Sequence, residues 1–450
     1  MADTKDYMER LPNDGMPTES LKERVEAPRD YAGAQAKTDP EEIRMVRKLD
    51  CRIMPILWLM YFFNYVDRGA LAQARLNNFE QDLGMTGNDF NVAVSVLTVG
   101  YVLMQIPSNM LLTRVRPSVY LAACMIVCST RVRSTCWQPS TRAKVRRPRD
   151  SALIGGLSFA NLIAAGIFAG VDGKRGLSGW RWLFIIEGVA SALTAVAGLW
   201  LLPDTNETTR WLKEDERRIG RERLERDRLV DSQEHVPVME ALWDAATDKR
   251  LWLFCLIQDF HYAATSFINF LPTVIHDLDF TDTVALLLAC PPYFFACIAA
   301  LLLAWSSGRY HERTWHITAG FAVAVVGFVI AASTESTAGR YVACFVFAAG
   351  AFAVNSVITG WIATTLSQSA EKKAVALAAA NVCAQIGQIY GPYLWPKTDG
   401  PRYLIGFTAS AGFSLLSLLL CWVMRFLLKR QNRRVQQQAA ADGVCNLYSY

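Results

Sequence analysis

The sequence lacks the short motifs that mark the common enzyme classes. It contains no HExxH, GxSxG, GxGxxG or P-loop pattern, the patterns that hold a catalytic zinc, a nucleophilic serine, a dinucleotide or a nucleotide phosphate. Charged residues are also scarce, at 19% of the 450 residues against about 25% in an average soluble protein. We therefore expect neither an enzyme nor an ATP-driven machine, and we predict no cofactor and no metal site.

Paired cysteine motifs are missing as well. None of the eleven cysteines stands in a CxxC pattern, so neither a disulfide framework nor a zinc site is predicted. Seven of them lie inside apolar runs, where we expect small core residues: Cys124, Cys255, Cys290, Cys297, Cys344, Cys383 and Cys421. The net charge of +5 predicts no nucleic-acid partner, because the basic residues cluster beside apolar runs.

Long apolar runs dominate what the sequence does contain. Hydrophobic residues make up 52% of the chain, and a helix needs roughly 20 mostly apolar residues to cross a bilayer. The sequence therefore predicts an all-α polytopic membrane protein embedded in a lipid bilayer. The ten predicted spans are 53–72, 92–112, 152–171, 183–202, 251–275, 284–305, 317–332, 341–366, 374–394 and 404–428, and a ten-residue run at 119–128 is an eleventh, short candidate.

Polar segments divide these spans into two halves. We predict a disordered cytoplasmic tail at 1–50, a first transmembrane half at 51–202, a cytoplasmic connector at 203–250, a second half at 251–428 and a cytoplasmic tail at 429–450. The first 50 residues contain no apolar core of a signal peptide. Lysine and arginine accumulate in both tails and in the connector, and the positive-inside rule places all three, and hence both termini, in the cytoplasm.

One stretch breaks the pattern of the first half. Seven basic residues and no acid stand between positions 131 and 149, where a membrane span is due. An arginine at the middle of a membrane helix costs roughly 2.5–3.5 kcal/mol. The domain is therefore predicted to be disrupted at 131–151.

Several motifs resemble one transporter family. They are RIMPILWLMYFFNYVDR (52–68), QIPSN (105–109), GWRWLFIIEG (179–188), LPD (202–204) with RWL (210–212), and Gly391-Pro392. These motifs closely resemble fungal major facilitator transporters of the anion:cation symporter (allantoate permease-like) family. The resemblance implies a two-half helical bundle in the plasma membrane, acting as a monomer. It also implies proton-coupled uptake of a small organic anion, such as a ureide, a vitamin carboxylate or a short peptide.

The chain departs from this family after residue 128. The family has twelve spans, whereas here the third is short and the fourth is absent, which leaves an incomplete bundle of 10–11 spans. If the short third segment also fails to cross, ten spans remain and residues 113–151 stay in the cytoplasm, as the positive-inside rule requires. The alternative function is then a transport-inactive or sensor-type protein derived from such a transporter. A channel is disfavoured because no filter motif appears.

Polar residues on one face of an apolar span are typical of a central aqueous cavity. The alternative is hydrogen bonding between helices, which the same residue types provide. The predicted substrate-binding residues are Asn64, Arg68, Gln105, Gln258, Tyr262, Asn269, Asn381 and Gln385.

Three ionisable residues are predicted to couple protons: Asp67, Glu187 and His261. Arg68 would attract the carboxylate of the substrate and Asp67 would respond to protonation, unless the two form a structural ion pair. Glu187 has the alternative of pairing with Arg181, and His261 that of packing in the core.

Glycine, proline and aromatic residues supply two further expectations. Gly391-Pro392, Pro396 and Pro291-Pro292 are predicted to interrupt spans, which is tolerated where backbone is buried or lines a cavity. Trp361, Tyr393 and Trp395 either stack on a flat substrate ring or belong to an interfacial belt.

Overall fold

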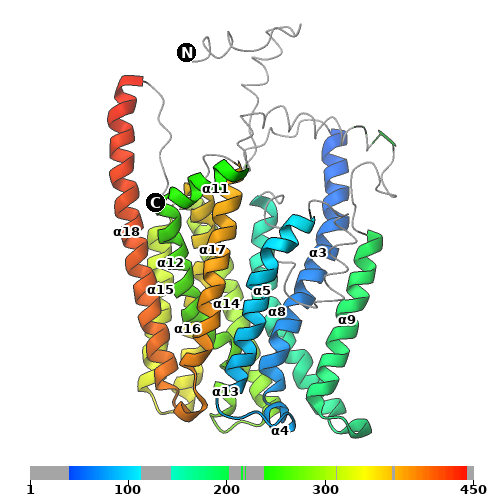
Figure 1. Cartoon of the computed structure of the whole chain (residues 1–450). Coiled ribbons are helices and arrows are strands. Elements are labelled where there is room, and N and C mark those ends of the chain that lie inside the picture. Colours follow the sequence, from blue (N-terminus) through cyan, green and yellow to red (C-terminus); the bar gives the residue numbers. More distant parts are fainter. Residues whose placement is uncertain are drawn as a thin grey trace.

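The structure is a computed structural model that describes residues 40–112, 143–201, 214–215, 218, 238–310, 312–366 and 370–442. Within these residues every regular element is a helix and no strand occurs (Figure 1). The predicted all-α class is therefore confirmed. The main elements are α3 (Pro40–Ala74), α4 (Phe79–Asp82), α5 (Asp89–Leu112), α8 (Ala143–Val171), η1 (Lys174–Gly176), α9 (Gly179–Leu201), α11 (Val238–Thr247), α12 (Lys249–Ala264), η2 (Thr265–Asn269), α13 (Leu271–His276), α14 (Asp282–Tyr310), α15 (Thr314–Ser333), α16 (Thr337–Thr365), α17 (Ala370–Tyr390), η3 (Gly391–Leu394), η4 (Lys397–Asp399) and α18 (Leu404–Asp442).

Six of the described helices are long and apolar enough to cross a membrane. They are Gly179–Leu199, Asp282–Tyr310, Thr314–Ser333, Thr337–Thr365, Glu371–Leu394 and Leu404–Arg433. Shorter apolar stretches occupy Asp89–Met104 and Ser158–Val171. All ten predicted spans fall on helical segments, whereas the short candidate at 119–128 lies outside the described residues.

Two groups of helices stand side by side (Figure 1). The first half contains α3, α5, α8 and α9, and the second contains α12 and α14 to α18. The halves meet along two seams, where α8 packs on α14 and α5 packs on α17. A serine hydroxyl marks each seam: Ser158 Oγ donates to the carbonyl of Cys290 at 3.0 Å, and Ser95 Oγ donates to that of Ile389 at 2.7 Å. The predicted two-half helical bundle is thus confirmed.

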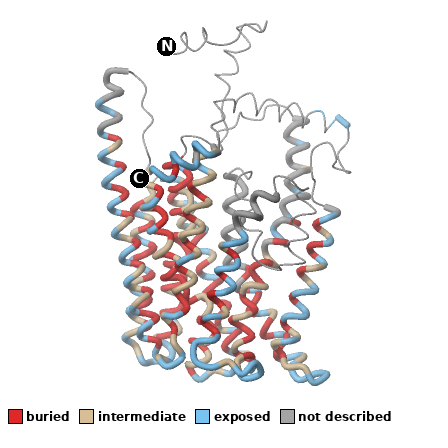
Figure 2. The backbone as a smooth tube through the Cα atoms, viewed as in Figure 1, coloured by how far each residue is buried: buried red, intermediate tan, exposed pale blue. Residues whose placement is uncertain are grey.

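The two ends of the bundle differ. We call the end that carries α11, the start of α3 and the end of α18 the connector end, and the opposite end, with α4 and α13, the short-loop end (Figure 1). Buried residues concentrate between the helices of the second half, and exposed ones alternate along the outer helices (Figure 2). Large apolar side chains such as Leu103, Leu302 and Phe426 are exposed, as expected where lipid covers a protein.

Small residues bring neighbouring helices into close contact. A Cβ atom added at Gly327 would collide with the backbone of Phe347, one at Gly350 with that of Ala324, and one at Gly387 with the carbonyl of Asp259. Glycine is therefore required where α15 crosses α16 and where α17 crosses α12. Such small-residue contacts are the usual basis of helix association in membranes, where burial of apolar surface gives little driving force.

The predicted span 251–275 is not one continuous helix. The structure divides it into α12, η2 and α13, so the predicted stripe of Gln258, Tyr262 and Asn269 does not lie on a single helix face. The helix gives way to 3₁₀ turns at Thr265, and the Phe270 amide bonds the carbonyl of Phe267, three residues earlier. A 3₁₀ turn has a different rotation per residue, which moves Asn269 off the face of the other two.

The predicted interruption at Pro291-Pro292 is wrong, because α14 continues through both prolines. Pro292 donates no hydrogen bond to the carbonyl of Leu288, four residues earlier. That carbonyl instead accepts the hydroxyl of Tyr341 from α16 at 3.0 Å. A neighbouring helix thus satisfies the carbonyl that proline leaves unpaired.

Both predicted tails are partly helical, so the predicted disorder of residues 40–50 is wrong. α3 begins at Pro40, ahead of the predicted boundary at residue 50, and α18 continues to Asp442, beyond the boundary at residue 428. Proline at the first helical position followed by two glutamates favours helix initiation in α3. Glutamine and alanine are good helix formers, and they fill the last turns of α18. α8 likewise begins at Ala143, inside the basic stretch.

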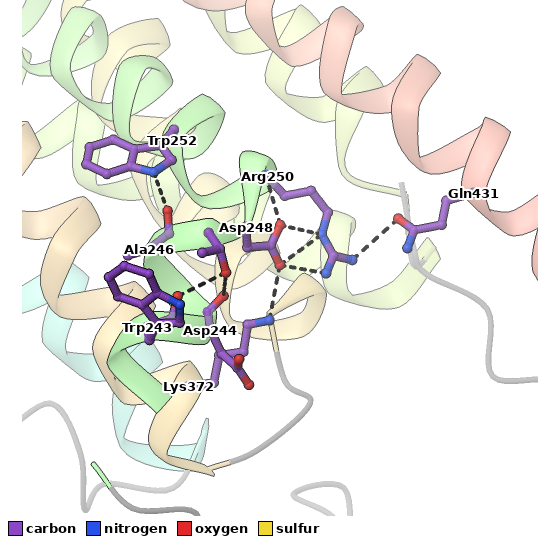
Figure 3. A network of polar contacts seen from close by, with 9 residues as sticks. Trp243, Asp244, Ala246, Asp248, Arg250, Trp252, Lys372 and Gln431 are labelled. Carbon is purple, nitrogen blue, oxygen red and sulfur yellow. Dashed lines mark hydrogen bonds and ion pairs between the residues drawn. The ribbon is translucent and has the colours of Figure 1, made fainter. Parts of the chain in front are cut away.

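A polar network ties the second half together at the connector end (Figure 3). Asp248 is the N-cap of α12 and accepts the backbone amide of Arg250 at 3.0 Å. Its carboxylate also binds the Arg250 guanidinium at 2.7 Å and Lys372 of α17 at 3.2 Å. Arg250 donates onward to Gln431 of α18 at 3.4 Å. Burial raises the pKa of Asp248, but the bonds from Arg250 and Lys372 outweigh burial and hold that pKa below its usual value.

Candidate functional site

Arg68 lies at the seam between the two halves. Its guanidinium carbon is 5.1 Å from the ring centre of Tyr65 and 5.5 Å from that of Tyr101 in α5, distances at which a cation is attracted to an aromatic face. The hydroxyl of Tyr101 in turn lies 3.5 Å from the amide nitrogen of Asn381 in α17. Two of the predicted binding residues, one from each half, are therefore brought together through Tyr101.

Tyr101 was not among the residues predicted from sequence. It stands three positions after Thr98 and four before Gln105, so it shares the face of the polar stripe in α5. The side chain of Gln105 itself lies outside the described residues. From sequence, a tyrosine within an apolar run is expected to pack in the core. Only the structure, which places the Tyr101 ring opposite Arg68 and its hydroxyl near Asn381, indicates a role at the seam.

Asp67 points to a different neighbour from Arg68. Its Oδ2 atom accepts the hydroxyl of Ser191 in α9 at 2.9 Å. Successive residues of a helix project about 100° apart, which allows Asp67 to face α9 while Arg68 faces α5. Asp67 therefore connects α3 to α9, and Arg68 connects α3 to the seam.

Glu187 is a buried carboxyl that no described residue binds. It is 3% exposed, and neither oxygen accepts a hydrogen bond from a described residue. It precedes Ser191 by one helical turn on α9, on the side of Asp67. The predicted alternative, a pair with Arg181, does not form, because the Arg181 guanidinium lies 5.1 Å from the ring centre of Trp180. A buried carboxylate without a donor is strongly unfavourable, so this position favours a carboxyl group that carries a proton.

His261 lies in the core of the second half. It is 1% exposed and packs edge-on against Phe321 of α15, with ring centres 5.6 Å apart. This position favours the packing role that was the alternative to proton coupling. Gln258 is also buried, and its Oε1 atom has no partner among the described residues.

The remaining predicted residues of the second half lie near a pair of helix breaks. The carbonyl of Tyr262 accepts the amide of Gln388 in α17 at 2.8 Å, and Asn269 ends the 3₁₀ segment η2. Gln385 is half-buried, and no described residue bonds its side chain. Its amide is therefore available to a ligand.

The predicted stacking of Trp361 and Trp395 on a flat substrate is wrong. Both indoles are fully buried. Trp361 packs edge-on against Phe254, and Trp395 stacks on Phe270 with ring centres 5.8 Å apart. Their alternative, an interfacial belt, is excluded by the same burial. Tyr393 alone of the three is exposed.

The short-loop end is closed between the halves by an ion cluster. Glu80 in α4 binds Arg75 at 2.7 Å and Lys397 of the second half at 2.9 Å. Burial raises the pKa of Glu80, but the bonds from Lys397 and Arg75 outweigh burial and lower it overall. We call these three residues the short-loop latch.

Aromatic rings seal the latch on its inner side. The Arg75 guanidinium lies 4.5 Å from the ring centre of Phe90 and 5.5 Å from that of Phe270. Phe90 belongs to the first half and Phe270 to the second, and their rings meet edge-on at 6.0 Å. Charges and rings together close this end of the seam.

Comparison with known proteins supplies the family. Residues 134–392 match the family model described as Major Facilitator Superfamily. The match starts within the basic stretch. The MFS transporter prlL of a fungal species is 27% identical over 90% of this chain and 90% of its own length. The MFS-type transporter efuF of Hormonema carpetanum is 27% identical over 86% and 85%, and the major facilitator-type transporter hxnP of Emericella nidulans is 23% identical over 98% and 95%.

Two solved structures share the fold. A bacterial homologue of the human lysosomal transporter Spinster, in an inward-facing and unoccupied conformation, superposes with a TM-score of 0.61 at 14% identity, over 86% of this chain and 98% of that one. A D-xylose–proton symporter superposes with a TM-score of 0.60 at 13% identity, over 82% and 97%.

Proposed function

The chain belongs to the Major Facilitator Superfamily, and from this membership we propose that it is a secondary transporter that takes up a small organic anion with protons by alternating access. As a member it is a multi-pass membrane transport protein and not an enzyme. The anion and the coupling proton are the parts that we propose. The observation that carries them is that Arg68 and Asp67 occupy adjacent faces of α3, with Arg68 toward the seam and Asp67 toward α9, the helix that contains Glu187.

Arg68 supports an anionic substrate. A guanidinium within a membrane protein is expensive to bury, and here it lies against the rings of Tyr65 and Tyr101, while the Tyr101 hydroxyl contacts the amide of Asn381. A carboxylate that enters the seam would find a bidentate cationic partner there. Gln385 lies one turn after Asn381 on α17 and supplies a further amide. We propose Asn64, Gln105, Gln258, Tyr262 and Asn269 as additional contacts.

Asp67 and Glu187 support proton coupling. Glu187 lies one helical turn before Ser191, which binds Asp67, and neither Glu187 oxygen accepts a hydrogen bond from a described residue. Two carboxyl groups in one region of the helix contact do not readily carry two negative charges. We propose that this pair binds the coupled proton. His261 was predicted as a third proton carrier, but because it packs against Phe321 it is the weakest of the three candidates for proton coupling.

The closed short-loop end supports alternating access. Among the described residues, the latch and its aromatic seal join the halves at the short-loop end, while the connector end carries the polar network of Asp248 within the second half. If the connector end is cytoplasmic, as the basic residues predict, the state described here faces inward. The Spinster homologue with the same fold is named as inward-facing.

The remaining expectations from sequence stand as proposals. We propose that the chain descends from the allantoate permease-like branch, lacks the fourth span, resides in the plasma membrane with both termini in the cytoplasm, and acts as a monomer. A glycosylation acceptor inserted at Ser140 tests the missing span. We expect no glycosylation, because residues 113–151 stay in the cytoplasm, whereas a glycosylated product would refute the ten-span topology.

Uptake by permease-deficient yeast tests the function. We expect cells that express the chain to accumulate at least one of radiolabelled allantoate, nicotinate or pantothenate, and a protonophore to abolish that accumulation. Arg68→Ala should reduce the rate at least about tenfold, the effect of losing roughly 1.4 kcal/mol of binding. Arg309→Ala is the matched control, because Arg309 is exposed at the end of α14. Normal surface expression without uptake of any probe would favour the transport-inactive alternative.

A further inference from the structure

Two helices of the second half break at the same level. α12 ends at Ala264 and α17 ends at Tyr390, and each continues as a 3₁₀ segment, η2 and η3. The two segments pack on one another: a Cβ added at Gly391 would lie 2.6 Å from the Cβ of Ser266, and the Trp395 indole donates to the hydroxyl of Ser266 at 3.1 Å. The breaks therefore form one paired structure.

Each break is stabilised by the other helix. The carbonyl of Tyr262, near the end of α12, accepts the side-chain amide of Gln388 at 2.8 Å and the hydroxyl of Thr265 at 3.1 Å. The hydroxyl of Tyr390, the last residue of α17, donates to Oδ2 of Asp259 at 2.9 Å. Ile389 lies between Gln388 and Tyr390 in α17, and its carbonyl accepts the hydroxyl of Ser95 from the first half at 2.7 Å. One turn of α17 thus joins the break in α12 to the other half of the molecule.

Asp259 is the charged member of this structure. Its Oδ1 atom is buried and accepts no hydrogen bond from any described residue. The titratable groups that face it are the Tyr390 hydroxyl and the Cys383 thiol, both from α17. From α18, the ring of Phe413 packs against Tyr390 and Phe260. No cation among the described residues pairs with Asp259.

We propose that Asp259 is a second proton-binding residue, in the half opposite Asp67 and Glu187, and that its bond with Tyr390 sets the conformation of the paired breaks in α12 and α17. This inference rests on the proposed transport function and adds a titratable site to it. Asp259 did not belong to the polar stripe of its span, since it lies one position beyond Gln258, and no sequence pattern marked it.

The geometry gives the direction of the effect. The proton binds Oδ1, because Oδ2 already accepts the Tyr390 hydroxyl. Protonation removes the buried charge and converts a charge-assisted hydrogen bond into a weaker neutral one. The last turn of α17 is then held less firmly to α12, and this is the turn that Ser95 of the first half contacts. Proton binding in the second half thereby loosens a contact between the halves.

Transport assays separate coupling from a merely structural role. We expect Asp259→Asn to lower the steady-state accumulation ratio of the transported probe to unity, because the proton gradient no longer drives it. Exchange of labelled for unlabelled probe across the membrane should stay within about twofold of the unmutated chain, since exchange needs no net proton movement. Asp259→Glu should restore accumulation. Asp244→Asn on the exposed helix α11 is the control.

A second variant tests the hydrogen bond. Tyr390→Phe removes the donor that favours the ionised carboxylate, so the pH profile of uptake should move to higher pH. Normal accumulation by Asp259→Asn with an unchanged pH profile would overturn the inference. If Asp259→Asn loses both exchange and accumulation, the inference is also overturned, because Asp259 would then have a structural role.

A measurement without substrate keeps the inference testable if the chain transports none of the probes. Glu80→Cys and Lys397→Cys place two thiols across the short-loop latch, with exposed Cys51 replaced by serine, and a short bismaleimide reports how often that end is closed. We expect the cross-linking yield, normalised at each pH to single-maleimide labelling of the same thiols because thiols react more slowly in acid, to differ between acidic and neutral pH, and Asp259→Asn to abolish that difference. A pH response that persists in Asp259→Asn would refute the role of Asp259, whereas failure of uptake alone would refute the proposed function.

Discussion

At the scale of single residues, four acids with restricted exposure fall into two groups. Asp248 and Glu80 are half-buried at helix ends, and each binds two cations. Glu187 is buried and Asp259 is half-buried within the predicted spans; among the described residues Glu187 accepts no hydrogen bond and Asp259 accepts one. A fully bonded carboxylate stabilises one conformation, whereas one that lacks donors responds to a proton. The first group therefore contributes to stability and the second to the proposed transport.

Replacement of Asp248 should reveal its contribution to stability. Asn is an equally good N-cap, so Asp248→Asn removes the charge and keeps the cap. We expect a loss of about 1 kcal/mol at neutral pH, below the roughly 1.5–3 kcal/mol of hydrogen bonds to charged groups because the half-exposed site is partly screened by solvent. The pKa of Asp248 is lowered in the folded protein, so its stabilisation is present above the unfolded pKa of about 3.9 and is lost as pH falls through the folded value.

Thermal unfolding in detergent at neutral and acidic pH measures this effect. The difference in unfolding midpoint between Asp248→Asn and the unmutated protein should be largest at neutral pH and should shrink in acid. An equal difference at both pH values would show that the charge of Asp248 does not matter. Asp244→Asn, in the exposed part of α11, serves as the reference for loss of a carboxylate without ion pairs.

At the scale of helices, contacts between neighbours decide where glycine is needed. A Cβ at Gly387 would collide with the backbone of α12, whereas one at Gly412 in α18 would meet no atom within 4 Å. Gly387→Ala should therefore destabilise the protein by about 1–3 kcal/mol through overpacking. Gly412→Ala should leave stability unchanged or raise it by up to about 1 kcal/mol, because alanine restricts the unfolded chain.

The two glycine variants form a matched pair for thermal unfolding in detergent. Both change one hydrogen to a methyl group within a helix, so they differ only in the space around that group. Opposite signs of the shift in midpoint are expected. A similar shift in both variants would mean that α12 and α17 do not approach one another as described.

Helix continuity also depends on neighbours. Pro291 and Pro292 were predicted to interrupt α14, and the Tyr341 hydroxyl from α16 prevents this by binding the carbonyl of Leu288. Conversely, the predicted span 251–275 breaks where Gln388 of α17 supplies an amide to the carbonyl of Tyr262. In both places a side chain from another helix binds a backbone carbonyl next to the feature, and at Tyr262 the hydroxyl of Thr265 from the same segment binds that carbonyl as well.

At the scale of the whole molecule, the short-loop latch should control access. Uptake by alternating access requires Glu80 and Lys397 to separate. We therefore expect a bismaleimide link between Glu80→Cys and Lys397→Cys to stop uptake. A link between Glu335→Cys and Arg402→Cys should not, because this ion pair lies within the second half. Uptake that continues through the linked latch would refute a gate at this end.

The sequence by itself determined the class of this protein, the place of its long apolar helices and its division into halves. The physical reason is that the bilayer acts on each segment separately, so length and composition of a segment suffice. It also placed Arg68 and Asn381 on polar faces. Only the tertiary structure decided what those faces meet: Tyr101 between Arg68 and Asn381, Ser191 against Asp67, and Tyr390 against Asp259. Periodicity fixes the side of a helix that a residue occupies, but the partner on that side belongs to a segment far away in the chain, and packing of the two halves selects it.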